Sequence, residues 1–422
     1  GKSTLIKNTL TQKDVYFMAQ NADESIQRMQ LANTIGEKIP GFESVVYPDW
    51  NSLFTNLNNV TKESFTLCID EFPYLVKSST GLPGILQQMI DTTIKRKFHL
   101  VLCGSSQQMM KGLVIDSASP LYGRADEIMK ITPLEAGWLT NALGCTSENA
   151  IAEYSIWGGV PRYWELRAEN KSMKSAVINT ILDRYGVLHE EPVRLFLDDM
   201  RESVQAFSIL SVVGSGCNRI SEIAGRLNKP ATQLSRPIDC LIQLGYLKRE
   251  LPFGESVKTS KRGIYKIADP FMNFYFSFLA PNLSRLELGL TNQVYSAFEA
   301  RQSKYVSQEW ENLCRRCVPM SPIEGIDFDI ASRWWGSNLK KEQMEFDVVA
   351  ESLDRKVLLI GECKWSKITD SNRIFYELEE KAKVFPFAEG KSIMLALFVK
   401  SHPKKNEDSR ILGPSDVLER LR

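Results

Sequence analysis

Short apolar stretches alternate with helical ones over the first 132 residues, and this alternation constrains the fold more than any other feature. Four stretches read as strands: DVYFMAQ at 14–20, FTLCID at 65–70, LVLCGS at 100–105 and EIMKIT at 127–132. Strands joined by helices in this way form a parallel sheet covered on both faces. Such sheets bind ligands beyond the carboxyl ends of their strands, so the residues that follow each strand are candidates for a site.

The chain begins with Gly1, Lys2, Ser3 and Thr4, which match the end of the pattern G-x-x-x-x-G-K-[ST]. In that pattern backbone amides surround the phosphates, the lysine reaches the β- and γ-phosphates, and the Ser/Thr hydroxyl holds Mg²⁺. The apolar run that follows fits a helix whose amino end points at the phosphates. The first turn of a solvent-exposed helix could have the same sequence, so the tetrapeptide alone is weak evidence for a phosphate-binding loop. We expect a strand and the first glycine of the loop upstream of residue 1.

An acidic pair, Asp70 and Glu71, ends the apolar stretch FTLCIDEF. In a nucleotide-hydrolysing site the first carboxylate would bind Mg²⁺, directly or through water, and the second would polarise the attacking water. A strand that runs into an acidic turn is the plain alternative. The order of this stretch after GKST, and its distance from it, favour the functional interpretation.

Two further positions are candidates for contact with the phosphates. Ser105 or Ser106 follows the stretch FHLVLCG and would lie near the γ-phosphate, although an ordinary strand-to-loop turn fits equally well. Arg124 precedes the stretch at 127–132 and could face a phosphate, from its own chain or from a neighbouring subunit. A surface arginine is the commoner explanation of a single arginine.

Composition sets limits on the class of protein. A length of 422 residues suggests about three domains, and the net charge of +1 gives no global sign of nucleic acid or membrane binding. No apolar run is long enough to predict a membrane span. Eight scattered cysteines predict buried thiols in a reducing cytoplasm. Cys314 and Cys317 form one CxxC, which we interpret as core packing because no second pair completes a zinc site. The chain has only three histidines, so catalysis by histidine is a poor explanation of its function.

Residues 196–280 change character. Two short amphipathic helices and a β-hairpin predict a winged helix-turn-helix. The hairpin region carries a local group of basic residues suited to phosphate contacts: Lys248, Arg249, Lys258, Lys261, Arg262 and Lys266. Many winged helices bind protein instead, and Pro237 departs from a smooth recognition helix. The side chains to test for DNA contact are Thr232, Ser235 and Arg236.

Near the carboxyl end, EFDVVAESLDRKVLLIGECKWS predicts two strands joined by a turn. Asp347 lies on the first, and Glu362 and Lys364 share a face of the second because side chains alternate along a strand. An Asp followed by Glu-x-Lys is the constellation of restriction-endonuclease-like folds. There Asp347 and Glu362 would hold Mg²⁺ and Lys364 would position water. Glu345 is a candidate accessory ligand. An exposed Glu–Lys ion pair is the alternative.

A helix upstream of these strands, VSQEWENLCRRCV, would supply one more carboxylate. Glu311 is the candidate, with Glu309 as the alternate and Trp310 packing inward. A helix and a buried strand after the hairpin complete the order α-β-β-β-α-β, which suits the same fold.

The combination resembles the AAA-like archaeal ATPases of bacteria and archaea, a family related to the signal-transduction ATPases. The resemblance rests on GKST, LCIDEFPYL, LVLCGSS, SPLYGR, WGGVPRYW and WWG, and it covers nearly the whole chain. It implies a helical lid in which Gly158, Gly159 and Pro161 pack near the nucleotide. It also implies a winged helix and an endonuclease-like domain after the lid, without implying that DNA is cut.

We therefore expect an α/β protein with four parts: a P-loop ATPase core with a parallel sheet (1–135), a helical lid (136–195), a winged helix-turn-helix (196–280) and a restriction-endonuclease-like α/β domain (295–422). The expected ligands are ATP and Mg²⁺, with DNA as a partner of the last two parts, no membrane, and a homo-oligomer as one option. The expected function is ATP hydrolysis coupled to a DNA-binding, Mg²⁺-dependent nuclease region. The alternative is a nucleotide-dependent regulator that binds DNA or protein without cleaving it.

Overall fold

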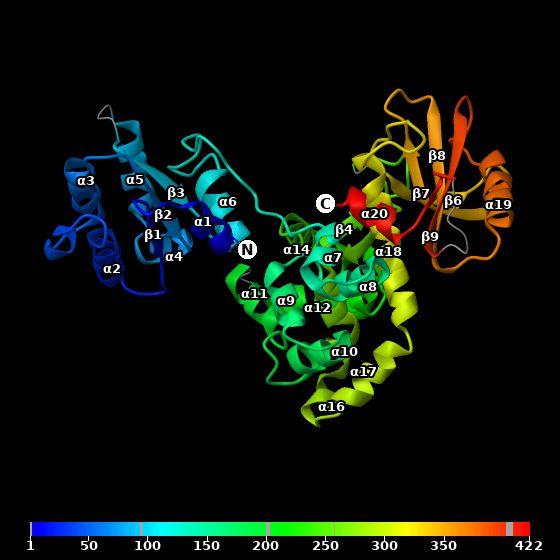
Figure 1. Cartoon of the computed structure of the whole chain (residues 1–422), viewed down its shortest axis with the longest axis horizontal. Coiled ribbons are helices and arrows are strands. Elements are labelled where there is room, and N and C mark those ends of the chain that lie inside the picture. The colour runs from blue at the N-terminus through cyan, green and yellow to red at the C-terminus, as the bar shows by residue number, and fades with distance from the viewer. Residues whose placement is uncertain (1, 93–95, 200–202, 257, 402–407) are drawn as a thin grey trace. The chain divides into compact units, whose positions relative to one another are not determined.

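The computed structural model describes the chain except for residues 1, 93–95, 200–202, 257 and 402–407 (Figure 1). The chain divides into two compact units. The first consists of Gly1–Thr132 with Leu197–Arg201, and the second of Pro133–Phe196 with Glu202–Arg422. Within the described parts, no helix is long and apolar enough to cross a membrane.

The first unit contains a three-stranded parallel sheet in the order β1-β2-β3, as the βα alternation predicts. Its strands are β1 (Val15–Met18), β2 (Phe65–Asp70) and β3 (Phe98–Leu102). The helices are α1 (Lys2–Thr9), α2 (Glu24–Gly36), α3 (Trp50–Val60), α4 (Phe72–Ser78), α5 (Leu82–Asp91) and α6 (Gln107–Val114), with a 3-10 turn at Phe42–Ser44. Apolar residues of the sheet and of α2, α3, α4 and α5 form the core, so the carboxyl edge of the sheet is held firmly.

The prediction of a fourth strand at 127–132 is wrong. These six residues are described, and none of them has strand structure. Ile128 and Met129 are 60% and 66% exposed. An apolar run becomes a strand only where a neighbouring strand satisfies its backbone N–H and C=O groups, and the run itself does not encode that partner.

The second unit begins with a helical part, as predicted for residues 136–195. It contains α7 (Leu139–Leu143), α8 (Ser147–Trp157), α9 (Pro161–Ala168) and α10 (Met173–Ala176), with a 3-10 turn at Ala136–Trp138 and a π-helical segment at Val177–Leu182. Helix α11 (Glu191–Asp199) follows, of which residues 191–196 belong to this unit. The turn between α8 and α9 needs its glycines. Gly158 has a φ of 57°, and a Cβ on Gly159 would lie 2.1 Å from the carbonyl oxygen of Leu134. The Gly-Gly-x-Pro stretch is therefore a tight backbone crossing.

Three helices and a hairpin follow, which confirms the predicted order of elements. They are α12 (Ser203–Gly214), α13 (Ile220–Leu227), α14 (Ala231–Gln243), β4 (Leu247–Glu250) and β5 (Ile264–Ile267), the last two antiparallel. The predicted inner faces of α13 and α14 are buried at Ile223, Leu234, Ile238 and Leu241. Thr232, Ser235 and Arg236 are exposed, as a contact surface requires.

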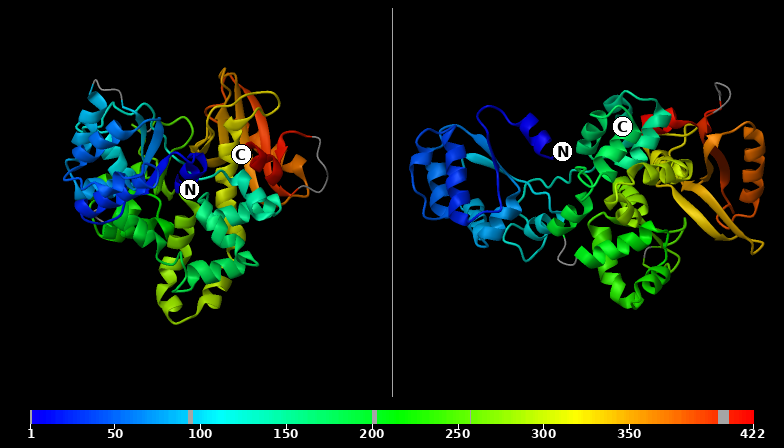
Figure 2. Two further views of the ribbon diagram at one scale, coloured as in Figure 1. Left: turned by 60° about the vertical axis from the view of Figure 1, so that its left-hand side comes forward. Right: turned by 90° about the horizontal axis from the view of Figure 1, so that it is seen from below.

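A further group of helices carries the aromatic stretch at 269–279. Its elements are α15 (Pro270–Phe274), a π-helical segment (Tyr275–Leu279), a 3-10 turn (Ala280–Asn282), α16 (Leu283–Glu287), α17 (Thr291–Glu299) and α18 (Gln302–Cys317), followed by a 3-10 turn at Val318–Met320. Figure 2 shows these elements in yellow-green to yellow. Phe271, Phe274, Tyr275 and Phe276 are buried, so the aromatic stretch packs in the core.

The chain ends in a five-stranded sheet of order β10-β9-β8-β7-β6. Its elements are β6 (Ser332–Ser337), β7 (Gln343–Glu351), β8 (Val357–Lys367), α19 (Ser371–Lys383), β9 (Ser392–Ser401), β10 (Ile411–Leu412) and α20 (Pro414–Arg420). The pairs β6–β7 and β7–β8 are antiparallel, and β8–β9 and β9–β10 are parallel. With α18 in front, the predicted α-β-β-β-α-β order is confirmed, and β6 is an edge strand.

Candidate functional sites

The first candidate site lies at the carboxyl edge of the parallel sheet, where α1 begins. The Ser3 hydroxyl donates a hydrogen bond to Oδ2 of Asp70 at 2.7 Å, and the ammonium of Lys2 donates to the carbonyl oxygen of Gly104. Gly104 follows β3 and Asp70 ends β2, so three segments far apart in the sequence converge. Thr4 is exposed, and Gly1 lies outside the described residues.

Glu71 reaches the same edge through a strained backbone. Its φ of 54° lies in the left-handed region that residues other than glycine rarely adopt. Its Oε2 accepts hydrogen bonds from the hydroxyl of Ser105 at 2.8 Å and from its amide at 3.2 Å. Ser106 instead caps α6, accepting from the amide of Met109 at 3.3 Å. Of the two serines that the sequence left open, Ser105 therefore touches the site.

The Asp70 carboxyl is buried, yet it is held in its charged form. Burial acts to raise the pKa of Asp70, but hydrogen bonds from Tyr16, Ser3 and Cys103 outweigh it and leave the pKa below its usual value. The Tyr16 hydroxyl donates to Oδ2 at 2.7 Å, and burial beside this carboxylate raises the pKa of Tyr16 to about 12. The sequence analysis missed Tyr16, because a tyrosine inside an apolar strand reads as core.

Arg124 is engaged elsewhere in this structure. Its Nε and Nη2 donate to the two carboxylate oxygens of Asp91 at 2.8 and 2.7 Å, a bidentate pair at the end of α5. Contact of Arg124 with a phosphate stays a prediction.

The second candidate site lies on the hairpin β7–β8 of the second unit. Oδ2 of Asp347 accepts from the amide of Cys363 at 2.9 Å. The ammonium of Lys364 lies 2.5 Å from Oε1 of Glu362, and that of Lys381 on α19 lies 3.9 Å from Oε2. Burial raises the pKa of Asp347, and the charge of Glu362 raises it further. The hairpin thus brings the predicted Asp347, Glu362 and Lys364 together.

Glu311 joins this group from α18. Burial raises its pKa, and the nearby Asp347 charge adds to the shift. The two other carboxylates have separate partners. Glu309 accepts from the side chain of Asn312 at 3.0 Å, and Glu345 pairs with Arg333 at 2.7 Å. Among the described residues, no group of three or more His, Cys, Asp or Glu side chains is placed so that it could hold a metal ion.

Two of the six predicted basic residues of the β4–β5 hairpin are paired with carboxylates, and burial lowers the pKa of a third, Lys248. Contact of this hairpin with phosphates stays a prediction. Lys266 pairs with Glu250 at 2.8 Å and Arg262 with Glu255 at 2.7 Å. Arg249 donates to the carbonyl oxygen of Ser260 at 2.6 Å. Counting charges along the chain does not reveal such pairs. The two further basic residues of the loop are exposed, namely Lys258 and Lys261.

Residues 251–256 and 258–263 between β4 and β5 are called the hairpin loop below, and this loop is docked on the edge strand β6. The amide of Phe253 donates to the carbonyl oxygen of Arg333 at 2.9 Å, and the guanidinium of Arg262 donates to that of Trp335. The rings of Phe253 and Phe387 meet edge to face with centroids 5.5 Å apart. The hairpin loop therefore belongs to the packing of the carboxyl-terminal sheet.

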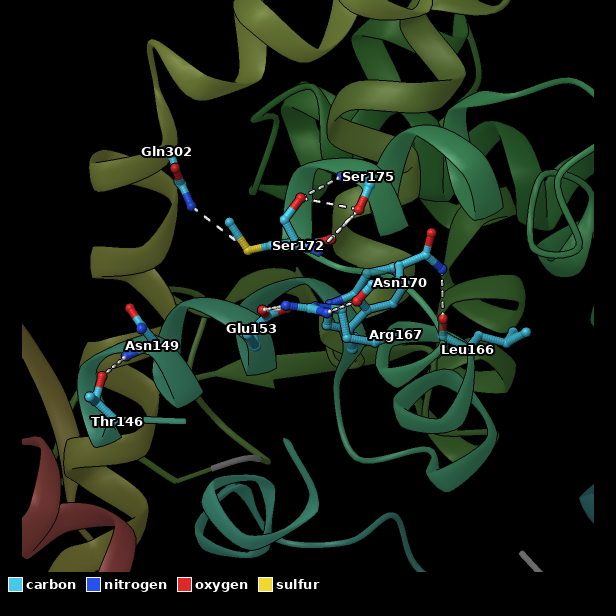
Figure 3. Close-up of polar contacts among 11 residues, drawn as sticks. Thr146, Asn149, Glu153, Leu166, Arg167, Asn170, Ser172, Ser175 and Gln302 are labelled. Carbon is cyan, nitrogen blue, oxygen red and sulfur yellow. Dashed lines mark hydrogen bonds and ion pairs between the residues drawn. The ribbon is translucent and has the colours of Figure 1, made fainter. Parts of the chain in front are cut away.

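A buried ion pair in the helical part was also missed by the sequence analysis (Figure 3). Glu153 on α8 and Arg167 on α9 have side chains 7% and 14% exposed, and Nη2 of Arg167 lies 2.7 Å from Oε1 of Glu153. The indole of Trp157 donates to the same carboxylate at 2.8 Å. The WGGVPRYW stretch joins these two helices, so the pair holds that turn.

Comparisons with known proteins identify an ATPase domain in the amino-terminal part of the chain. Residues 1–165 match a family described as an ATPase domain predominantly from Archaea, and residues 275–374 match archaeal and bacterial proteins of unknown function. An uncharacterized protein of Methanocaldococcus jannaschii is 26% identical over 433 residues, covering 99% of this chain and 92% of that protein.

Two solved structures are similar to this chain. A Walker-type ATPase of Pyrococcus abyssi has a TM-score of 0.50 at 18% identity, covering 65% of this chain and 87% of that one. The ORC2 protein of Aeropyrum pernix has a TM-score of 0.36 at 12% identity, covering 68% and 82%, which is too low to inform the fold. The amino-terminal part of the chain is an ATPase domain on the strength of the family match, and the Pyrococcus structure agrees with its fold.

Proposed function

We propose that the protein binds and hydrolyses ATP at the carboxyl edge of the β1–β3 sheet and uses the cycle to control a DNA-directed carboxyl-terminal region. The convergence of Lys2, Ser3, Asp70 and Glu71 at that edge supports the first half of this proposal. A cation, a hydroxyl and two carboxylates with distinct surroundings are what phosphoryl transfer to water requires.

Each residue has a separate role in this proposal. Lys2 would leave the carbonyl oxygen of Gly104 and contact the β- and γ-phosphates. Glu71 would hold and orient the attacking water, with Ser105 fixing its carboxylate. Tyr16 keeps Asp70 ionised and oriented.

The residues fit a magnesium ion at this site. The Ser3 hydroxyl and Oδ2 of Asp70 are 2.7 Å apart, close to the separation of about 2.9 Å between adjacent ligands of an octahedral Mg²⁺ with bonds of about 2.05 Å. Ser3 and Asp70 would hold the ion, which would neutralise phosphate charge. The protein's own residues would then bind and orient the nucleotide.

The carboxyl-terminal region would act on DNA. The helix order α12–α13–α14 followed by a hairpin supports a winged helix-turn-helix, with the exposed Thr232, Ser235 and Arg236 on α14 as DNA contacts. The clustering of Asp347, Glu362 and Lys364 beside Glu311 supports a restriction-endonuclease-like site. Two carboxylates suit Mg²⁺ when phosphate and water oxygens supply the other ligands.

A nucleotide-dependent regulator that does not cut DNA is the second candidate. It is favoured by the pairing of Lys364 with Glu362 at 2.5 Å, because an ion pair of this kind also forms where no chemistry occurs.

A cleavage assay on the full chain separates the two. Linear and supercoiled DNA are incubated with Mg²⁺ or Mn²⁺ and ATP, and Asp347→Asn is compared with the wild type. Metal-dependent cleavage that is lost in Asp347→Asn supports the nuclease. ATP turnover and DNA binding without cleavage of any substrate support the regulator, and the absence of ATP turnover with Mg²⁺ contradicts the proposal as a whole.

A further inference from the structure

Arg315 on α18 lies at the centre of a buried charge network beside the second candidate site. Its side chain is 7% exposed. Nη1 donates to the carbonyl oxygen of Asp347 at 2.9 Å, and Nη2 donates to Oδ1 of Asn312 at 2.8 Å. The same guanidinium lies 3.5 Å from a carboxylate oxygen of Glu250 and 3.8 Å from one of Glu311. Arg315 thus contacts β7, its own helix and the β4–β5 hairpin.

Glu250 ends β4 and is ionised in this environment. Burial acts to raise its pKa, but the charges of Lys266 and Arg315 outweigh it and leave the pKa of Glu250 below its usual value. Two carboxylates, Glu250 and Glu311, therefore share one guanidinium. Glu250 is also paired with Lys266 at 2.8 Å. The Arg315 guanidinium divides its attraction between Glu250 and Glu311, so removing the charge of Glu250 leaves more of that attraction for Glu311.

We propose that Glu250 is a positioning residue for the Asp347–Glu362 site. Glu250, which directly precedes the docked hairpin loop, draws Arg315 away from Glu311. The site thereby stays able to bind a divalent cation. The proposal rests on the proposed metal-dependent function of that site. Three observations carry it: the shared guanidinium, the hydrogen bond from Arg315 to the Asp347 carbonyl oxygen, and the docking of the hairpin loop on β6.

The consequence of removing the Glu250 charge follows from the geometry. In Glu250→Gln the guanidinium of Arg315 has Glu311 as its remaining carboxylate partner within 4 Å among the described residues. It will close on Glu311 and neutralise it, which removes negative charge beside the Asp347–Glu362 site and weakens the attraction of that site for a divalent cation. Changes to residues that support a metal ligand commonly lower metal affinity about 10- to 100-fold.

The experiment measures Mn²⁺ binding by the full chain with electron paramagnetic resonance. Only the Mn²⁺ that binds to the wild type and not to Asp347→Asn is counted, so that ions bound at the ATPase site are excluded. Glu250→Gln is compared with Glu250→Asp, which keeps the charge, and with Glu153→Gln. The last variant weakens a buried ion pair with an arginine far from the cluster in sequence, and so controls for loss of stability alone.

We expect Glu250→Gln to lower the Asp347-dependent Mn²⁺ affinity about tenfold, Glu250→Asp to restore most of it, and Glu153→Gln to leave it unchanged. Wild-type affinity in Glu250→Gln overturns the proposal, and so does an equal loss in Glu153→Gln.

Hydrogen exchange in β7 separates failure of this inference from failure of the metal site itself. If the wild type binds no Asp347-dependent Mn²⁺, the proposed function of the site fails. Faster exchange at Gln343–Glu351 in Glu250→Gln, but not in Glu153→Gln, would then still support the positioning of Asp347 through Arg315. Unchanged exchange overturns it.

Discussion

The hydroxyl of Ser3 and the carboxylate of Asp70, 67 positions apart in the chain, are joined by a hydrogen bond of 2.7 Å. One belongs to the first turn of a helix and the other to the last residue of a strand. Their contact brings the GKST and FTLCIDEF stretches to one edge of the sheet. It also makes the amino-terminal site open to direct test by substitution.

Glu71→Gln should abolish most ATP hydrolysis while leaving ATP binding intact. The amide keeps the hydrogen bond from Ser105 but is a poor acceptor for a proton from the attacking water. Loss of such a general base costs about a hundredfold or more in rate. Phosphate release and the affinity for a fluorescent ATP analogue are the measurements. The control is Glu63→Gln, an exposed residue just before β2. Unchanged turnover in Glu71→Gln would exclude the proposed role.

Tyr16→Phe should destabilise the first unit and weaken its use of Mg²⁺. The change removes a hydrogen bond to the buried Asp70 carboxylate, and a bond to a charged group is worth about 1.5–3 kcal/mol. Urea unfolding gives the free energy, and ATP turnover against Mg²⁺ concentration gives the second effect. Tyr122→Phe, half exposed in the same unit, is the control. If both variants unfold alike, the hydrogen bond contributes nothing.

Arg167→Met should lower the free energy of unfolding of the second unit by about 3–5 kcal/mol, because it leaves the buried Glu153 carboxylate without its cation. Arg162→Met on the same helix breaks an exposed pair with Glu165 and should cost about 0–1 kcal/mol. Chemical denaturation followed by tryptophan fluorescence compares the two. Equal losses would show that burial of the Glu153–Arg167 pair does not determine its contribution.

Asp269→Asn should stabilise the protein at neutral pH and not in acid. Burial raises the pKa of Asp269 to about 6 from 3.8. Stability from the protonated carboxyl is therefore full below pH 3.8 and lost as the pH rises through about 6. The charged form then costs about 3 kcal/mol, which the neutral asparagine avoids while still able to accept from the Met272 amide. Thermal unfolding from pH 4 to pH 8 measures the difference. Asp239→Asn, exposed on α14, should show no such trend, and a gain for Asp269→Asn that is constant with pH would contradict the assignment.

Local pattern was enough to predict the three strands that carry the first candidate site, namely β1, β2 and β3. The stretches around Leu67 and Leu100 are apolar, short and bounded by polar turns, a pattern that indicates buried strands. The position of Asp70 and Ser105 then follows from the parallel sheet, because carboxyl ends of parallel strands share one edge. Asp347 and Glu362 come together for a different reason, because the antiparallel strands of a hairpin place residues opposite one another.

Long-range pairing could not be read in this way. The run around Ile128 has strand-like composition but lacks a partner among the described residues. The basic hairpin residues Lys266 and Arg262 have acidic partners, and Glu250 lies beside Arg315 through folding alone. Tyr16 serves a carboxylate 54 positions away. Each of these outcomes depends on which residues come into contact when the chain folds, and local sequence pattern does not predict such contacts.

The docking of the hairpin loop on β6 also covers an edge strand that could otherwise pair with another chain. The carbonyl oxygens of Arg333 and Trp335 receive hydrogen bonds from Phe253 and Arg262 instead of facing solvent. An uncovered edge strand of this kind would pair with a strand of another molecule and promote fibrous aggregation. A protein whose loop were cut away should thus lose solubility before it loses its fold.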